Sequence, residues 1–267
     1  MSNSFLNIDN ISYSYSGSSW RLDSISLDIS KGDFIGIAGA NGSGKSTLLK
    51  IAAGILKPDN GRILLEDQSI TKIPRRELAR KIGYLPQQVN SAFEFTVKEV
   101  VLMGRFCHSK GLGLTTAEDR KIADHCMNAT ETLTFRDRSI NELSSGERQR
   151  VLLASVLAQQ PDIMLLDEPV TGLDLHHQIS FFNLLAEFSK KGMTIITITH
   201  DLNLASQFCD KILLLDKGKK EIYDSVEKAF ERLGQMNAYS DNISIFRHPH
   251  NQKPALLPYY NFSEESA

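Results

Sequence analysis

Apolar and polar residues alternate along the first thirty positions of the chain. Apolar residues recur at Phe5, Ile8 and Ile11, and residues 25–29 repeat the alternation as Ile-Ser-Leu-Asp-Ile. A period of two is typical of antiparallel strands that expose one face to water. The sequence therefore predicts an antiparallel β subdomain at the N-terminus.

From residue 33 onward, short apolar runs alternate with helical patterns. Residues 33–38 (DFIGIA) lead into a Gly-rich turn and a helix predicted over residues 45–54, and a turn at 58–61 precedes a predicted strand at 62–65. Further compact apolar strands are predicted at residues 163–166, 194–198 and 212–215, with helices at 175–191 and 202–209 between them. Strands that alternate with helices predict an α/β core with a parallel sheet covered on both faces.

Helical patterns replace this alternation in the middle of the chain. They cover residues 97–105, 117–132 and 146–159. We therefore predict one domain over residues 1–234, with a helical subdomain at about 88–160 inserted in the α/β core. Residues 235–267 form a C-terminal extension rich in Pro, His and Asn, which we expect to be loosely packed.

Composition narrows the classes of function. The 267 residues carry a formal net charge of −2, so little counterion release would drive binding to nucleic acid, and none is expected. Three cysteines without a C-x-x-C pair argue against a disulfide framework or a zinc site. We see no secretory signal and no apolar run long enough to span a bilayer, so a soluble chain that meets a membrane only through a partner is expected.

A phosphate-binding loop follows the strand predicted at residues 33–38. Residues 39–47 read G-A-N-G-S-G-K-S-T and match G-x-x-x-x-G-K-[ST] between a strand and a helix. Glycines allow backbone N–H groups to surround an oxyanion, and the helix N-terminus favours negative charge. Lys45 would reach the β- and γ-phosphates and Ser46 would bind Mg²⁺. The expected nucleotide-binding residues of this loop are Gly39, Asn41, Gly42, Ser43, Gly44, Lys45, Ser46 and Thr47.

Two acidic residues end the strand predicted at residues 163–166. A carboxylate at the C-terminal end of a strand beside a phosphate loop is a typical Mg²⁺ ligand. We expect Asp167 to hold the metal through water and Glu168 to polarise the attacking water.

Residues 143–147, L-S-S-G-E, resemble the L-S-G-G-Q signature of ATP-binding cassette proteins. In physical terms this segment is a helix N-terminus with a hydroxyl cap and small residues, which suits an anion. The resemblance implies a P-loop NTPase (RecA-like) fold, and a homodimer in which Ser144 and Gly146 cap the γ-phosphate held by the other subunit. Ser145 and Glu147 depart from the motif, and Ser145 bears on how closely the backbone approaches the nucleotide.

Other landmarks of the cassette family fall in the expected order. Gln87 matches the glutamine that touches Mg²⁺ and water, with Gln88 as the competing assignment. His200 matches the switch histidine that bonds the γ-phosphate, and Asp174 matches the loop that crosses the dimer interface. Tyr15 matches the aromatic residue that stacks on adenine, with Tyr13 as its rival.

Local sequence favours a membrane importer within this family. Residues 96–105, 173–178 and 200–205 resemble cassettes that serve iron-chelate, haem and cobalamin importers. The alternatives are a zinc or manganese importer and a soluble cassette of the iron–sulfur assembly type. The resemblance implies ATP and Mg²⁺ as cofactors, permease subunits and through them a substrate-binding protein as partners, and a cytoplasmic location on the inner face of the cell membrane.

We expect the permease to dock on the helical subdomain close to Gln87. Phe93, Phe95 and Phe106 are too close together in the chain for all to be buried, and Arg105 is a further candidate for this surface. His248 and His250 in the extension lack a third metal ligand at a suitable spacing and are interpreted as part of a polar tail.

Overall fold

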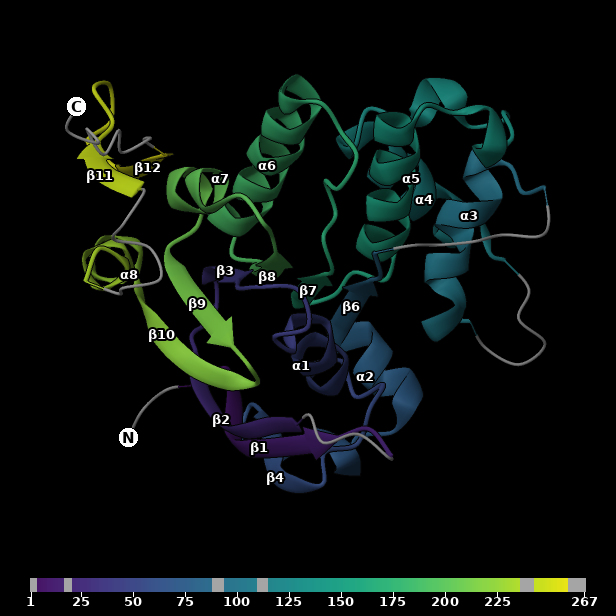
Figure 1. Ribbon diagram of the computed structural model, residues 1–267. Coiled ribbons are helices and arrows are strands. Elements are labelled where there is room, and N and C mark those ends of the chain that lie inside the picture. The colour runs from purple at the N-terminus through teal and green to yellow at the C-terminus, as the bar shows by residue number, and fades with distance from the viewer. Residues whose placement is uncertain (1–3, 17–20, 88–93, 110–114, 236–242, 259–267) are drawn as a thin grey trace.

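The computed structural model describes residues 4–16, 21–87, 94–109, 115–235 and 243–258. Two larger sheets organise the described chain (Figure 1). The first is antiparallel, with the order β2-β1-β4-β5, and consists of β1 (Leu6–Ser14), β2 (Arg21–Ile29), β4 (Asn60–Leu65) and β5 (Gln68–Ser69). This sheet confirms the predicted N-terminal subdomain. Its buried apolar residues, among them Ile8, Ile11 and Ile25, face the core.

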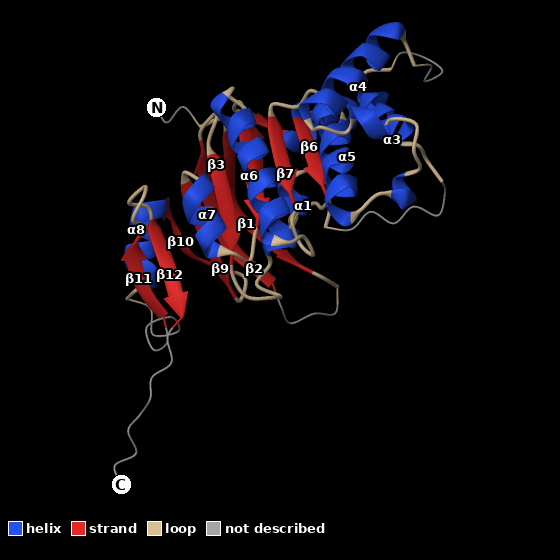
Figure 2. Cartoon of the chain, turned by 90° about the horizontal axis from the view of Figure 1, so that it is seen from above, coloured by secondary structure: helices blue, strands red, loops and turns tan. Residues whose placement is uncertain are grey.

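The second sheet has six strands in the order β10-β9-β3-β8-β7-β6. All neighbours are parallel except β9 and β10. The strands are β3 (Phe34–Ala38), β6 (Ile82–Leu85), β7 (Ile163–Leu166), β8 (Thr194–Ile198), β9 (Lys211–Asp216) and β10 (Lys219–Ser225). Strands β3, β7 and β8 are buried at every position, because helices cover both faces of this sheet. Figure 2 shows α6 and α7 on one face and α1 on the other.

The described residues also form eight α-helices and four short 3₁₀ helices. The α-helices are α1 (Lys45–Ala52), α2 (Arg75–Lys81), α3 (Val97–Met103), α4 (Ala117–Ala129), α5 (Ser145–Ala158), α6 (Leu175–Lys190), α7 (Leu202–Phe208) and α8 (Val226–Leu233). The 3₁₀ helices are η1 (Ile70–Lys72), η2 (Gly104–Cys107), η3 (Leu133–Phe135) and η4 (Ile140–Glu142).

Helices α3, α4 and α5 form a bundle at one side of the molecule (Figure 1). The chain enters this bundle after β6 and leaves it into β7, and these two strands pair in parallel, with Ile82 opposite Ile163. The helical segment is thus an insertion between two neighbouring strands of the sheet. Capping boxes begin all three helices, at Thr96, Thr116 and Ser144.

The C-terminal extension is more ordered than its composition suggests. Residues 243–258 form a hairpin of β11 (Ile243–Arg247) and β12 (Pro254–Pro258), with Pro254 and Ala255 buried. The expectation of a loosely packed tail is therefore wrong for these residues. The order of these residues comes from tertiary contacts, because side chains of α7 hold the hairpin.

None of the helices in the described ranges is long and apolar enough to cross a membrane. The three cysteines, Cys107, Cys126 and Cys209, are free and buried.

Candidate functional site

Four parallel strands end at the same edge of the six-stranded sheet, and each is followed by a predicted site residue. Gly39 follows β3, Gln87 follows β6, Asp167 follows β7 and His200 follows β8. The carboxyl edge of a parallel sheet is the general location of ligand sites in α/β proteins. Parallel pairing of β3 with β8, β8 with β7 and β7 with β6 therefore gathers residues that are far apart in the sequence.

The phosphate loop is shaped by Gly39 and Lys45. Gly39 has a φ of 140°, and a Cβ at this position would lie 2.0 Å from the carbonyl oxygen of Leu215, so only glycine fits. The Lys45 Nζ donates to the carbonyl oxygens of Gly39 and Ala40, both at 2.9 Å. Burial lowers the pKa of Lys45, while the nearby carboxylates of Glu168 and Asp167 act in the opposite direction. The ammonium group is thus held across the loop, at the N-terminus of α1.

The Ser43 hydroxyl is buried in this loop and has no hydrogen-bond partner within the described residues. An unpartnered buried hydroxyl beside a lysine and a helix N-terminus fits a phosphate oxygen, because the anion would satisfy it. The residues present therefore fit the nucleotide that the sequence implies.

A cavity of about 420 Å³ lies over the loop. Every residue that lines it was predicted from the sequence to belong to the site: Tyr15, Asn41, Gly42, Gly44, Lys45, Ser46, Thr47 and Glu168. Tyr15 and not Tyr13 lines this cavity, with its hydroxyl 3.4 Å from Thr47 Oγ1. The two tyrosine rings meet edge to face at 5.1 Å. This geometry favours Tyr15 over Tyr13 as the residue beside a base.

Ser46 and Asp167 form the second element of the site. The Ser46 hydroxyl donates to Asp167 Oδ1 at 2.8 Å, and the Tyr84 hydroxyl donates to Asp167 Oδ2 at 3.2 Å. A hydroxyl and a carboxylate beside a phosphate loop are the oxygen ligands that Mg²⁺ prefers, so this pair fits the metal. Sequence reasoning missed Tyr84. Burial, followed by the negative charge of Asp167, raises its pKa, so it stays a neutral donor.

Glu168 has the most connected side chain of the site. Its carboxylate accepts from Gln87 Nε2 at 2.7 Å and from the Thr171 hydroxyl at 3.1 Å, and it lies 2.7 Å from His200 Nε2. Its φ of 51° is in the left-handed region, which is unfavourable for glutamate. The strand end thus holds this carboxylate in a strained position among three polar side chains. Gln88, the alternative to Gln87, lies outside the described residues.

Ser144, Gly146 and Asp174 lie apart from this cavity, since none of them lines it. Ser144 is the N-cap of α5 and forms a capping box with Glu147. The Glu147 backbone N–H donates to the Ser144 hydroxyl, and the Glu147 carboxylate accepts from the Ser144 hydroxyl and backbone N–H. Asp174 is the N-cap of α6 and lies 2.8 Å from His177 Nδ1. The His177 ring packs so closely on Gly146 that a Cβ there would lie 3.1 Å from it. One chain thus carries a phosphate cavity and, apart from it, a surface where the signature segment and Asp174 both contact His177.

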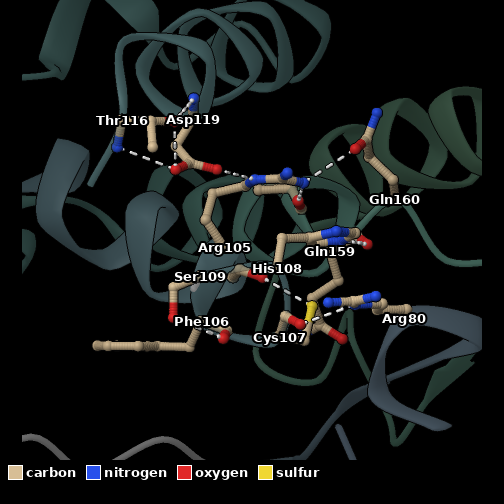
Figure 3. Close-up of polar contacts among 12 residues, drawn as sticks. Arg80, Arg105, Phe106, Cys107, His108, Ser109, Thr116, Asp119, Gln159 and Gln160 are labelled. Atoms are coloured by element: carbon tan, nitrogen blue, oxygen red, sulfur yellow. Dashed lines mark hydrogen bonds and ion pairs between the residues drawn. The ribbon is translucent and has the colours of Figure 1, made fainter. Parts of the chain in front are cut away.

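The surface predicted for a partner is described in part. Phe106 is 64% exposed, Phe95 is half-buried and Phe93 lies outside the described residues. Arg105 does not belong to the exposed surface. It is buried and ion-paired with Asp119 at 2.9 Å, and it donates to the Ala158 carbonyl and to Gln160 Oε1 (Figure 3). A charge at this depth needs a partner, and the Thr116–Asp119 cap supplies it.

Comparison with known proteins agrees with this geometry. The model of the ABC transporter family matches residues 22–171, and the chain belongs to this family. Hemin import ATP-binding protein HmuV of Gloeobacter violaceus is 37% identical over 246 residues, which covers 90% of this chain and 89% of that protein. Petrobactin import ATP-binding protein FpuC of Bacillus anthracis is 36% identical over 255 residues, which covers 95% and 92% of the two chains.

An uncharacterised ABC transporter ATP-binding protein of Bacillus subtilis is 36% identical over 243 residues, and the match covers 90% of this chain and 55% of that protein. Among solved structures, a metal-chelate type ABC transporter in an inward-facing conformation has a TM-score of 0.83 at 27% identity, with 97% of this chain and 98% of that chain covered. A dimeric bacterial ABC transporter cassette has a TM-score of 0.73 at 30% identity, with coverage of 82% and 98%. The predicted fold class, an ABC cassette with a P-loop NTPase core, is confirmed.

Proposed function

We propose that this protein is the ATP-hydrolysing subunit of an ABC importer for an iron chelate, haem or a cobalamin-type compound. The observation that carries the ATPase assignment is the Glu168 carboxylate, held between Gln87 and His200 at the edge of the phosphate cavity. The names of the hemin and petrobactin import relatives support the class of cargo.

The residues divide the hydrolysis of ATP between them. Lys45 and the backbone of the phosphate loop bind and orient the phosphates, and Tyr15 lies beside the base. Glu168 accepts hydrogen bonds and would polarise the attacking water, which Gln87 and His200 help to orient. Ser46, Asp167 and Gln87 would hold Mg²⁺, which when bound supplies positive charge to the transferred phosphoryl group. Catalysis of this kind depends on positioning and charge, and little covalent chemistry is asked of the protein.

A second copy of the chain is the proposed source of Ser144, Gly146 and Asp174 at each ATP. These residues lie away from the chain's own phosphate cavity, and the N-terminus of α5 suits an anion. Two chains related by a twofold axis would then place two ATP molecules between them. The dimeric cassette among the structural relatives supports this arrangement.

The permease is proposed to dock in the groove of the helical subdomain. A cavity of about 270 Å³ there is lined by Phe95, Glu99, Leu102, Met103, Arg105, Phe106, Ser109, Thr115 and Asp119. Phe106 extends away from the Arg105–Asp119 pair, as Figure 3 shows, and Met103 is also exposed. Helix α3 is the first described helix after Gln87 in the sequence, so a partner in this groove would respond to changes at the phosphate site. The cassette would thus lie on the cytoplasmic face of the membrane, with a substrate-binding protein reached only through the permease.

The test of the proposed function is reconstitution with permease subunits in proteoliposomes. We expect ATP-dependent uptake of a haem, siderophore or cobalamin probe with the wild-type chain and none with Glu168→Gln. Uptake of zinc or manganese ions instead would overturn the proposed cargo class. Failure of the purified chain to hydrolyse ATP would overturn the enzymatic assignment itself.

A further inference from the structure

The C-terminal hairpin is attached to α7 by several side chains of that helix. The Ser206 hydroxyl donates to the carbonyl oxygen of Pro254, and Lys253 Nζ donates to the carbonyl oxygen of Gln207 at 2.8 Å. Figure 1 and Figure 2 both show β12 next to α7. The hairpin lies beyond residues 22–171, which the family model matches.

Asn203 makes the most specific of these contacts. Its side-chain oxygen accepts from the Leu256 backbone N–H at 2.7 Å, and its side-chain nitrogen donates to the Leu256 carbonyl oxygen at 3.1 Å. A carboxamide presents one donor and one acceptor side by side, so it pairs with strand backbone as a neighbouring strand would. Asn203 therefore fixes the first turn of α7 to the outer edge of β12.

The same turn of α7 begins two residues after His200. Residues 199–201 are all that joins the end of β8 to the start of α7. Asp201 caps the helix by accepting from the backbone N–H groups of Asn203 and Leu204, at 2.8 and 3.0 Å. On the other side, the Thr199 N–H donates to the Ile37 carbonyl oxygen of β3. His200 thus lies between a buried strand and a helix whose first turn is bonded to the hairpin.

A cavity of about 540 Å³ joins the hairpin to the site. Glu168 and His200 line one part of it, and Ile243, Leu256 and Pro258 of the hairpin line another. His200 is half-exposed into this region while its Nε2 lies 2.7 Å from Glu168 Oε1. The hairpin therefore forms part of the wall of a cavity that His200 and Glu168 also line.

We infer that the C-terminal hairpin holds His200 in its working position, and that Asn203 is the positioning residue that transmits this constraint. The inference rests on the proposed function, because it takes Glu168 and His200 as the hydrolytic groups. A three-residue connection has little freedom, so a small displacement of α7 moves the imidazole relative to Glu168. Misplacement of about 1 Å can cost on the order of 100-fold in rate.

The experiment compares ATP turnover of the purified full-length chain with that of Asn203→Ala. We expect kcat to fall about tenfold or more, while KM for ATP and the affinity for a non-hydrolysable ATP analogue stay within about twofold. If Asn203 only supported folding, Asn203→Ala would lower the fraction of active molecules. That loss alone would not distinguish an effect on His200 from other losses of activity. Asn128→Ala is the matched control, since Asn128 is an exposed asparagine on α4, and we expect it to keep the wild-type kcat.

Two further variants make the test specific. Leu256→Pro removes the backbone N–H that Asn203 binds, and it spares the hairpin ladder because both backbone groups of Leu256 face Asn203. We expect it to lower kcat as Asn203→Ala does, and the double variant to lower it no further. In a His200→Ala background, Asn203→Ala should have no additional effect on the residual kcat.

A wild-type kcat in Asn203→Ala, or an equal further loss in the His200→Ala background, would overturn the inference. Either result would leave the proposed function intact, since wild-type turnover and its loss in Glu168→Gln would still hold. Turnover retained in Glu168→Gln would instead remove Glu168 from the role of base, and the inference with it, while failure of the wild-type chain to hydrolyse ATP would remove the proposed function itself.

Discussion

His200 Nε2 and Glu168 Oε1 lie 2.7 Å apart, although 32 positions separate the two residues in the chain. Gln87 Nε2 donates to the other oxygen of the same carboxylate, also at 2.7 Å. One carboxylate at the end of β7 thus contacts the residues that follow β6 and β8, its two neighbours in the sheet. Any movement of these strand ends changes the hydrogen bonds of Glu168, which makes it the natural point at which to test the site.

Glu168→Gln should nearly abolish ATP turnover and spare ATP binding. The amide keeps the shape of the side chain but cannot polarise water, and the Lys45 loop is untouched. General base catalysis contributes about 10²–10⁴-fold, which sets the expected loss in kcat. Phosphate release and analogue binding are the two measurements. We also expect ATP to drive this variant into a stable dimer on size-exclusion chromatography, and turnover near the wild-type rate would remove Glu168 from the role of base.

The sequence could predict that the candidate site residues lie together, because they belong to one loop or follow the ends of strands. Gly39, Lys45 and Ser46 belong to one continuous loop, and apolar runs before Asp167 and His200 identify the strands that carry them. Parallel pairing then brings these residues to one edge. No contact between distant side chains had to be foreseen.

The features that sequence reasoning missed depend on such contacts. Nothing in the composition of the extension indicates that Asn203 and Ser206 hold a hairpin. Arg105 reads as a surface residue until its ion pair with Asp119 and its bonds to the end of α5 are seen. Tyr84 reads as one more apolar strand residue until its bond to Asp167 is known.

Lys45→Ala should weaken ATP binding as well as turnover. The Lys45 ammonium group lies at the N-terminus of α1, where it donates to the carbonyl oxygens of Gly39 and Ala40. It would contact phosphate before and during the reaction. A hydrogen bond to a charged group is worth about 1.5–3 kcal/mol, which predicts an affinity roughly 10–100-fold lower. Titration with a fluorescent ATP analogue measures the change. Unaltered affinity would contradict the proposed contact with the nucleotide.

Ser46→Ala should raise the Mg²⁺ concentration needed for half-maximal turnover. The variant removes one proposed oxygen ligand and leaves Asp167 with its bond from Tyr84. Turnover measured against Mg²⁺ at fixed ATP shows the shift, which we expect to be about tenfold, a loss of about 1.4 kcal/mol. Thr71→Ala, which changes an exposed hydroxyl bonded to Ser69, is the control and should match the wild type. A wild-type Mg²⁺ dependence in Ser46→Ala would exclude Ser46 as a ligand.

Asp119→Asn should destabilise the fold in a pH-dependent way. Hydrogen bonds from Thr116, and then the Arg105 guanidinium, lower the pKa of Asp119 from 3.8 to about 2. A lowered carboxylate pKa stabilises the fold fully above its unfolded value, and this contribution disappears as the pH falls from about 4 toward 2. The stability gap between wild type and variant should therefore shrink by about 1 kcal/mol from pH 7 to pH 3.

Urea unfolding at pH 7 and at pH 3 measures this change in the gap. Asp124→Asn is the control, because Asp124 lies on the same helix in an exposed pair with Arg136, at 3.5 Å. Such a pair is worth less than about 1 kcal/mol, so we expect little change at either pH. A gap between wild type and Asp119→Asn that is the same at both pH values would show that ionisation of Asp119 does not stabilise the helical subdomain.

Phe106→Ser should uncouple transport without slowing basal ATP turnover. Phe106 is 64% exposed at the rim of the groove proposed for the permease, and its ring points away from the buried Arg105–Asp119 pair. The substitution should therefore change stability by no more than about 0.5 kcal/mol. Loss of an aromatic anchor from an interface commonly costs about 2 kcal/mol or more, which predicts much weaker binding of the permease.

Ile55→Ser is the matched control, since Ile55 is 54% exposed in the loop after α1, outside the groove. If Phe106→Ser supports wild-type uptake in proteoliposomes while Ile55→Ser does not, the docking surface lies elsewhere on the cassette.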